Sequence, residues 1–461
     1  MNLRRSLLFL SGQVGVMLLA RFFFQWVISF SSQPLSSAAG AAGAAGAAGA
    51  AGDGGALTLF SAAAVGAALL AFRVFDGVTD PIAGSFSDAW VARGRERRAL
   101  LWFAAPLPAL GLALCFAPTA ALAEGARWAL LLAGMFVFFV GYTVYAIPYW
   151  SLSGDYARSE EESKRLSTLL GAGVLIATAV GFVLTPSLVA AWGYADAALL
   201  IAGVSLPLMV APYFAAPQRE ESAAGEAGAA GAPLAPSLDA SGVGLRAVLG
   251  ALRDARFRAA LCLFGGSQMS LTVMTSAAPF IAVHLLGGDT GDVARLLGPL
   301  LGVALPASAL VPALSRRLGW ERGVAWACAL LALVYMGVAA LGARLIGTPM
   351  DTATLIFALG GPMIAALLGL EAEAITDCAN AERDRRAARG EEASLVGVYF
   401  GVYNLIVKAC NGVAIALTGL LAGLAAQGGA QAAWWTRAMG LSAGAMLLAG
   451  LGLYALLRPR A

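Results

Sequence analysis

The chain has 461 residues, of which 59% are hydrophobic and only 12% are charged. A soluble protein carries roughly 25% charged residues, so this composition excludes a water-facing surface over most of the chain. We therefore expect an all-α membrane protein whose backbone polar groups are satisfied within helices. The formal net charge of +3 comes without interleaved basic and aromatic residues, so we expect no nucleic acid partner.

About twelve apolar runs are long enough to cross a bilayer, for which about 20 residues are needed. In chain order they cover residues 6–30, 57–80, 99–118, 127–150, 166–192, 195–216, 259–286, 293–314, 321–342, 352–373, 395–424 and 433–457. Residues 217–240, between the sixth and seventh runs, carry many Pro, Gly, Ala and Glu residues. We therefore expect two six-helix domains, 1–216 and 259–461, joined by a cytoplasmic loop at 217–258. Paired bundles of this kind are typical of transporters with a binding site between them.

Basic residues are distributed unevenly between the two sides of the predicted membrane. Most of them, including those at 93–98 and 383–389, fall on the side that carries the N-terminus. The loops of the other side hold only Arg127, Arg295, Arg344 and Arg437. The positive-inside rule then predicts a multi-pass protein of the plasma (inner) membrane with both termini in the cytoplasm.

Two aspartates, Asp76 and Asp80, lie four residues apart inside the second apolar run. This spacing places both carboxylates on one face of a helix, with Arg73 on the same side. Ionisable groups at this depth are costly and mark an ion or substrate path by default. One interpretation is a structural salt bridge between Arg73 and Asp76. The other is a cation site, because one arginine cannot neutralise both carboxylates.

The surplus negative charge must bind a proton or a metal cation, or pair with a distant base. Burial and a neighbouring carboxylate both favour the protonated form of a carboxyl group, so proton exchange near neutral pH is expected. Lys408, in the middle of the eleventh run, is a suitable base. We expect it to pair with Asp76 or Asp80 if the two runs face each other. Alternatively, its side chain snorkels to a membrane interface.

Other polar and aromatic residues are candidates for a substrate cavity. Arg21 and Gln25 lie one turn apart in the first run, where Arg21 either lines the cavity or pairs with the aspartates. Tyr149 and Trp150 lie at the end of the fourth run, as interfacial anchors or as a platform for a sugar. In the eleventh run the candidates are Tyr403, Asn404 and Asn411, of which the two asparagines flank Lys408 in a polar stripe.

The cytoplasmic loops carry charges of both signs. Three groups of charges suggest an inner gate: Asp88 with Arg93–Arg98, Asp155 with Arg158 and Glu160–Glu162, and Asp377 with Arg383–Arg389. The candidate gate residues within these groups are Asp88, Arg95, Asp155, Arg158, Asp377 and Arg389. These residues are either solvated loop charges or ion pairs that break when the gate opens.

Nothing in the sequence indicates an enzyme or a metal centre. The five cysteines are far apart without ligand spacing, and His284 is the only histidine. We see neither a nucleophile–base pair nor a phosphate-binding glycine loop. We therefore predict no catalytic residue, no metal, no disulfide and no cofactor, with H⁺ or Na⁺ as a coupling ion.

Three segments in order resemble the glycoside–pentoside–hexuronide:cation symporters, the melibiose permease-like family of the major facilitator superfamily. They run from Arg73 to Gly84, from Tyr142 to Ser151, and from Asp377 on to Lys408. The resemblance implies a major facilitator fold with about twelve transmembrane helices in two six-helix bundles. It also implies cation-coupled uptake.

The resemblance assigns roles to matching positions. Asp76, Asp80 and Thr143 would bind the cation, Lys408 would lie beside that site, and Trp150 would stack on a sugar.

The chain departs from the melibiose-type pattern at several positions. Ala146 stands where that pattern has an aspartate, and Leu170 stands where it has a sugar-binding arginine. The first run carries Arg21 but no sugar-binding acid. A buried hydroxyl without a partner costs about 1–3 kcal/mol, so we do not expect a galactoside bound in the usual way of the family.

We expect a cation-coupled secondary transporter of a small organic solute, glycoside-like by family, working by alternating access in the lipid bilayer as a monomeric unit. One alternative is a lipid or lysolipid transporter or flippase of the same fold, since the departures favour an amphipathic substrate. The other is a membrane scaffold or sensor without transport.

Overall fold

The computed structural model describes residues 3–35, 58–156, 159–215, 249–341, 347–388, 396–426 and 428–458. Within these ranges the chain is helical apart from short connections and one isolated bridge between Pro34 and Thr58. The helices of the first half are α1 (Leu3–Ser31), α3 (Ala62–Ala92), α4 (Ala99–Ala104), α5 (Pro106–Phe116), α6 (Glu124–Tyr156), α7 (Glu160–Val210) and η1 (Ala211–Ala215). Those of the second half are α10 (Ala255–Phe280), η2 (Ile281–Leu285), α11 (Val293–Ser308), α12 (Val311–Met336), η3 (Gly337–Ala340), α13 (Pro349–Ala387), α14 (Val396–Ala425) and α15 (Gly429–Leu457).

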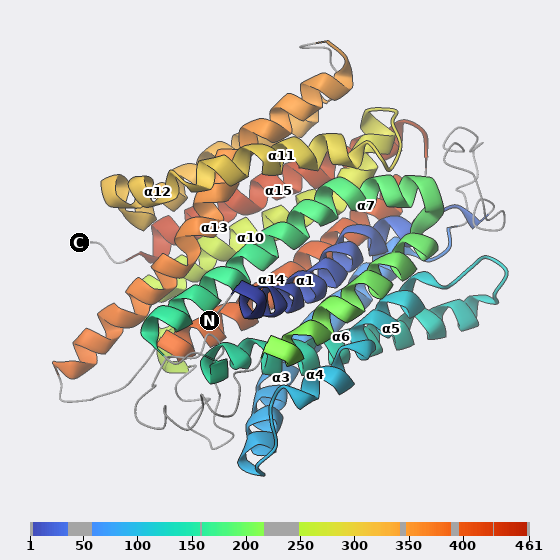
Figure 1. The fold of residues 1–461 in the computed structure, drawn as a ribbon. Helices are drawn as coiled ribbons and strands as arrows, with labels where there is room; N and C mark the ends of the chain where they lie inside the picture. Colours follow the sequence, from blue (N-terminus) through green and yellow to red (C-terminus); the bar gives the residue numbers. More distant parts are fainter. Residues whose placement is uncertain are drawn as a thin grey trace.

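The helix α7 contains two membrane crossings. It turns at Gly193, whose φ of 79° is accessible to glycine at little cost. Gly173 in its first half lies against Gln13 of α1, and Met209 in its second half lies against Gly15 of α1. The two halves therefore run back along the same helix, and Figure 1 shows the turn between them in green at the right.

The number of crossings agrees with the sequence prediction. Nine helices among the described residues are long and apolar enough to cross a membrane, and α7 counts once among them. The helices α10 and α11 supply two further crossings beside them. The helix α12 is broken at Gly319, which has a φ of 71°. The part before Gly319 continues the crossing of α11, and the part after it forms the next crossing. The fold is thus the predicted all-α arrangement of about twelve membrane-crossing helices.

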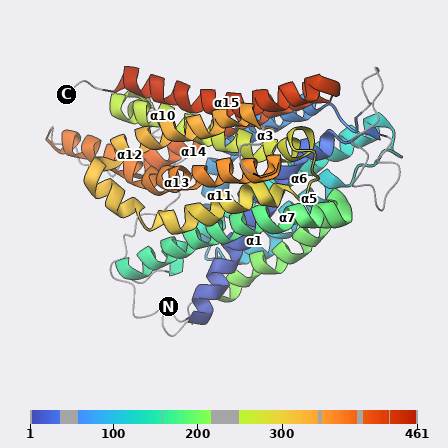
Figure 2. The same ribbon diagram turned by 90° about the horizontal axis from the view of Figure 1, so that it is seen from above.

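The helices pack into two bundles, α1 to α7 and α10 to α15. In the first bundle α1 packs against α7 and α5 against α6; in the second, α10 packs against α15 and α11 against α13. Both termini lie toward the left in Figures 1 and 2, and we call this the termini end of the molecule. Most of the segment predicted as the central loop, residues 217–258, lies outside the described residues; α10 already begins at Ala255.

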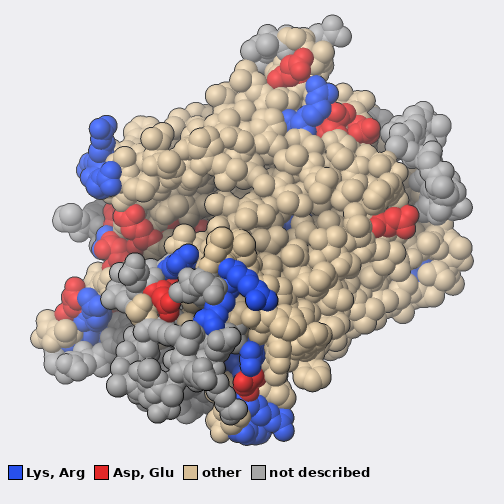
Figure 3. Space-filling view, viewed as in Figure 1, with Lys and Arg blue, Asp and Glu red and all other residues tan. Residues whose placement is uncertain are grey.

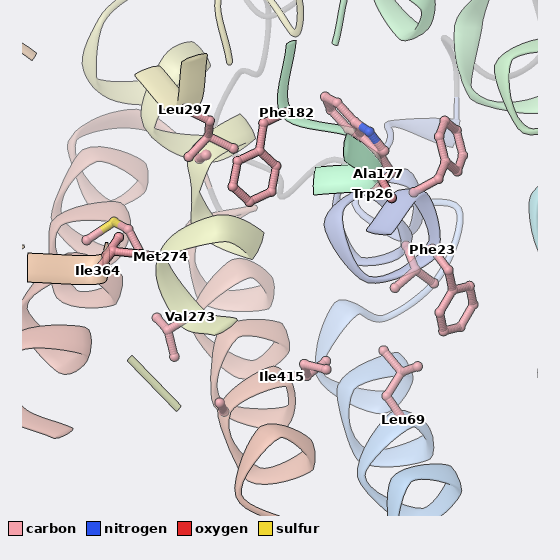
Figure 4. Close-up of a cluster of buried hydrophobic side chains, with 14 of the residues drawn as sticks. Phe23, Trp26, Leu69, Ala177, Phe182, Val273, Met274, Leu297, Ile364 and Ile415 are labelled. Atoms are coloured by element: carbon pink, nitrogen blue, oxygen red, sulfur yellow. The ribbon is translucent and has the colours of Figure 1, made fainter. Parts of the chain in front are cut away.

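The two bundles meet mainly along α3 and α14, with further contacts between α7 and α11 and between α1 and α10. Away from the termini end, Gly66 of α3 lies so close to α14 that a Cβ there would be 3.0 Å from the Cα of Ala416. Apolar side chains from both bundles fill this region, and Figure 4 shows Phe182 of α7 beside Leu297 of α11. These close contacts hold the two bundles together at the end opposite the termini.

Charged side chains gather at the ends of the molecule. Figure 3 shows Lys, Arg, Asp and Glu concentrated at the termini end, with a broad uncharged surface beside them. An uncharged surface of this kind suits contact with lipid tails. The structure therefore has the surface that a multi-pass membrane protein requires.

Candidate functional site

The helix α3 carries the two aspartates toward α14. Its start is fixed by Ser61, whose side chain accepts a hydrogen bond from a backbone N–H of the first turn. The helix then runs without interruption past Pro81. Asp76 and Asp80 consequently lie one turn apart on one face, and this face meets Lys408 on α14.

Asp76 lies at the centre of the site and is fully buried. Its Oδ1 accepts a hydrogen bond from Thr143 Oγ1 of α6 at 2.7 Å. Its Oδ2 lies 3.2 Å from Nη1 of Arg73 and 3.0 Å from Nζ of Lys408. The carboxylate thus connects three helices, one of them from the other bundle.

Lys408 is held between the two carboxylates. Its ammonium group also donates to Oδ2 of Asp80, and its side chain is only 15% exposed. The lysine therefore does not snorkel to an interface, and the pairing expected from the sequence is present. Two acids and the two bases Arg73 and Lys408 give this cluster a balanced charge, so Lys408 takes up the surplus negative charge that the carboxylate pair would otherwise carry.

The helices α3 and α14 pack closely beside the site. A Cβ on Gly412 of α14 would lie 3.0 Å from the Cβ of Arg73, so only glycine allows the two helices to approach this closely. The guanidinium of Arg73 also lies over the ring of Phe24 of α1, 4.3 Å from its centroid, which is a favourable cation–π contact. Arg73 therefore forms the salt bridge to Asp76 and also ties the network to α1 through Phe24.

Tyr149 and Trp150, the predicted aromatic platform, point toward α1 within the first bundle. Tyr149 is fully buried, stacks on Phe9 of α1 and donates to the carbonyl oxygen of that residue. Trp150 donates from Nε1 to Oε1 of Gln13 at 2.9 Å. The structure therefore gives Tyr149 a packing role and does not bring it to the aspartates.

The other candidates on α1 make no direct contact with the aspartates among the described residues. Among the described contacts, no ion pair or hydrogen bond joins Arg21 to either aspartate; its Cβ lies beside Gly181 of α7. Gln25 is 3% exposed, and neither atom of its side-chain amide has a hydrogen-bond partner. Because buried polar atoms are normally satisfied, Gln25 is a group to which a bound solute or water could bond.

Polar residues of the second bundle face one another across α10 and α14. Thr272 of α10 donates to Oδ1 of Asn411 at 2.9 Å. Asn404 is exposed, whereas Tyr403 is buried.

Glu371 of α13 lies near this stripe and was not singled out from the sequence. Its Oε2 accepts a hydrogen bond from Nε2 of Gln268 at 2.8 Å. The signal was available, since Glu371 falls within the predicted run 352–373, where any carboxylate is unusual.

The residues of the predicted inner gate form ion pairs within single bundles. Asp88 and Asp155 both pair with Arg97, each at 2.9 Å, and thus join α3 to α6. Arg95 stacks over the ring of Trp90 instead. Arg158 and Arg389 lie outside the described residues.

Asp377 belongs to a similar arrangement in the second bundle. It lies 2.8 Å from Nη2 of Arg256 and accepts a hydrogen bond from Nε1 of Trp320. None of these contacts crosses between the bundles, so a gating role for the charged loops stays a prediction. In the described part of the chain the cysteines are unpaired, and no group of side chains has the composition of a metal site.

Comparison with solved structures shows the same fold in several transporters. The chain is similar to a bacterial homologue of the human lysosomal transporter Spinster in its inward-facing, unoccupied form, with a TM-score of 0.64 and 14% identity over 99% of this chain and 97% of that one. The nucleoside transporter NupG gives a TM-score of 0.58 and 13% identity over 100% of both chains. A D-xylose–proton symporter gives 0.59 and 11% over 96% of both. Identities this low show the fold alone.

The sequence places the chain in a family. A search of curated proteins gave no match, but the model of the family described as MFS/sugar transport protein matches residues 58–451. This match covers most of the chain and agrees with the major facilitator resemblance of the sequence motifs. The chain therefore belongs to the MFS/sugar transport protein family, and it is a multi-pass membrane transporter of the major facilitator superfamily.

Proposed function

We propose that the protein is a cation-coupled secondary transporter, with a proton or sodium ion driving the movement of a small organic solute by alternating access. One observation carries this proposal. Lys408 of the second bundle is inserted between Asp76 and Asp80 of the first, in a region where ionisable groups are expensive.

Coupling follows from competition for the same carboxylates. A cation that binds Asp76 and Asp80, or protons that neutralise them, would weaken the hold on Lys408. The two bundles would then lose their main charged contact and could move relative to each other. A ligand shifts such an equilibrium only by its difference in affinity between the two conformations, and here that difference arises because the cation competes with Lys408.

The solute is proposed to be polar and glycoside-like, contacting the second bundle more than the first. Ala146 and Leu170, which replace the sugar-binding acid and base of the related symporters, are 1% and 8% exposed. Both are buried and therefore offer little exposed apolar surface to an amphipathic solute, so we give the lysolipid alternative less weight. The polar groups of α10 and α14, together with Gln25, are the available hydrogen-bond partners.

The positive-inside rule applied to this fold supports cytoplasmic termini. We infer that both termini are cytoplasmic, that the protein resides in the plasma (inner) membrane, and that a single chain is the functional unit. We propose no bound cofactor besides the coupling ion.

The test is a titration of the purified protein with sodium at several pH values, followed by tryptophan fluorescence. Wild-type protein is compared with Asp80→Asn and with the control Asp384→Asn, whose aspartate is 72% exposed. We expect a saturable response to sodium or to pH that the Asp80→Asn variant loses and the control keeps.

Folding is checked separately by size-exclusion chromatography. An Asp80→Asn protein that elutes like wild type and keeps the full response to both ions would contradict cation binding at this site. A response to sodium alone, or to pH alone, would identify the coupling ion and decide which gradient to use for a substrate screen.

A further inference from the structure

A second intramembrane carboxylate lies outside the Asp76/Asp80 network. Glu371 of α13 is partly buried, and its Oε2 accepts a hydrogen bond from the amide of Gln268 on α10. The hydroxyl of Tyr403 on α14 faces the same carboxylate, but it is buried without a hydrogen bond of normal geometry. The polar neighbours of Glu371 on the facing helices are therefore neutral.

The charged groups around Glu371 are engaged elsewhere. Glu373 lies two residues further along α13, on a different face of the helix, and accepts a hydrogen bond from Ser315 of α12. Asp377, further along α13, pairs with Arg256 of α10. On α14, Lys408 is held by the aspartates of α3.

Thiols complete the titratable surroundings. Cys410 of α14 lies near Tyr403, and Cys262 of α10 lies near Cys410. Both are neutral groups at ordinary pH. Among the described contacts, no lysine or arginine reaches Glu371, in contrast to Asp76.

An ionised carboxylate in these surroundings lacks the opposite charge that normally pays for burial. Binding one proton converts it to a neutral carboxylic acid, which the neutral Gln268 and Tyr403 can accommodate. Because Glu371 is only partly buried, water can deliver the proton. We propose that Glu371 is a proton-binding site of the second bundle, separate from the Asp76/Asp80–Lys408 network.

The separation has a consequence for coupling, which rests on the proposed function. Protonation of Glu371 leaves the balanced cluster around Lys408 unchanged, because the two sites share no contact in the part of the chain that the structure describes. The transporter would then have two ionic inputs: one that competes with Lys408 between the bundles, and one that removes a charge inside the second bundle. A proton would be a ligand of this protein even if sodium occupies the aspartate site.

The test is infrared difference spectroscopy of the purified protein during a pH titration, in H₂O and in D₂O. A protonated carboxylic acid has its own carbonyl stretch, which shifts on deuteration. We expect a titrating band of this kind in wild type, in Asp80→Asn and in the control Glu373→Gln. The band should be absent from Glu371→Gln.

A second variant keeps the proposal testable if Glu371→Gln fails to fold. Gln268→Leu removes a hydrogen bond that stabilises the ionised carboxylate, so the band should persist to higher pH, by about one unit or more. Retention of the unaltered band in Glu371→Gln would overturn the proposal, and so would an unchanged midpoint in folded Gln268→Leu. Because no step of this measurement requires transport, its failure would leave the cation site at Asp76 and Asp80 untouched.

Discussion

The two intramembrane carboxylate sites differ in the groups that surround their buried charges. On α3, Asp76 and Asp80 are matched by Arg73 and Lys408, and the match spans both bundles. On α13, the partners of Glu371 among the described residues are neutral and belong to its own bundle. The carboxylates of the first site are therefore neutralised by an ion-pair network that links the two bundles. The carboxylate of the second site is neutralised when it binds a proton or another cation.

This difference teaches which site should respond to conformation. Moving the bundles apart would break the contacts of Lys408 but would leave Glu371 with the same neighbours. Variants of the α3 network should therefore change both stability and transport, whereas variants of Glu371 should change the response to pH. The following predictions test this contrast, from the largest expected effect to the smallest.

The largest effect is expected for Lys408→Ala. Removing one partner of a buried ion pair costs about 3–5 kcal/mol, because Asp76 and Asp80 are then left with Arg73 alone. We expect a strong loss of thermal stability in detergent, measured by a melting curve, and a fluorescence response at lower concentrations of the coupling ion, because the ion no longer competes with Lys408 for the carboxylates.

The double variant Lys408→Ala/Asp80→Asn supplies the control. It restores charge balance, since one acid and one base remain, and it should regain part of the lost stability. Equal melting temperatures for the single and double variants would show that charge balance does not determine the stability of this site.

The next prediction separates the two aspartates. Asp76 is fully buried and has three partners, whereas the side chain of Asp80 is 23% exposed and contacts Lys408. Removing a charge that receives several hydrogen bonds costs more than removing one that receives few, by about 1–3 kcal/mol. We expect Asp76→Asn to melt at a clearly lower temperature than Asp80→Asn. A lower melting temperature for Asp80→Asn would show that Asp80 contributes more to stability than Asp76.

The close packing of α3 and α14 gives a third prediction. A Cβ on Gly419 would clash with the carbonyl oxygen of Ala62, whereas a Cβ on Gly452 of α15 would meet no atom within 4 Å. Both Gly→Ala changes gain about 1 kcal/mol in helix propensity, so their difference reports the clash, which overpacking puts at about 1–3 kcal/mol. We expect Gly419→Ala to be the less stable variant in melting curves. Equal stability would show that the bundles can separate here without cost.

The sequence predicted most of the fold because apolar run length and charge asymmetry are local properties. The predicted turn between the fifth and sixth runs, at residues 193–194, is found at Gly193. The pairing of Lys408 with the aspartates was also predictable, since an isolated lysine at that depth requires a carboxylate. The orientation of a side chain within a bundle could not be predicted from the sequence. Tyr149 was assigned to a cavity, but its packing against Phe9 depends on how α1 and α6 approach each other.

Two further misses have physical reasons. Arg97 rather than Arg95 pairs with Asp88 and Asp155, because the turn after α3 directs one of several nearby arginines toward α6. Loop geometry of this kind has no periodic signal in the sequence. Glu371 was overlooked because it lies near the end of its run, where a charge could equally well be solvated.

The smallest effect is expected at the exposed termini end, for Arg97→Ala. The side chain of Arg97 is 12% exposed, but those of its two partners are 49% and 41% exposed, and ion pairs that are open to solvent typically contribute about 0.2–1 kcal/mol. Arg95→Ala is the matched control, because that arginine lies in the same turn but stacks on Trp90 without pairing to either aspartate. We expect both variants to melt within a few degrees of wild type and to lose any difference at high salt, where exposed pairs are screened. A loss from Arg97→Ala as large as that from Lys408→Ala would show that an exposed ion pair at the end of the first bundle supports the fold as strongly as the buried network between the bundles.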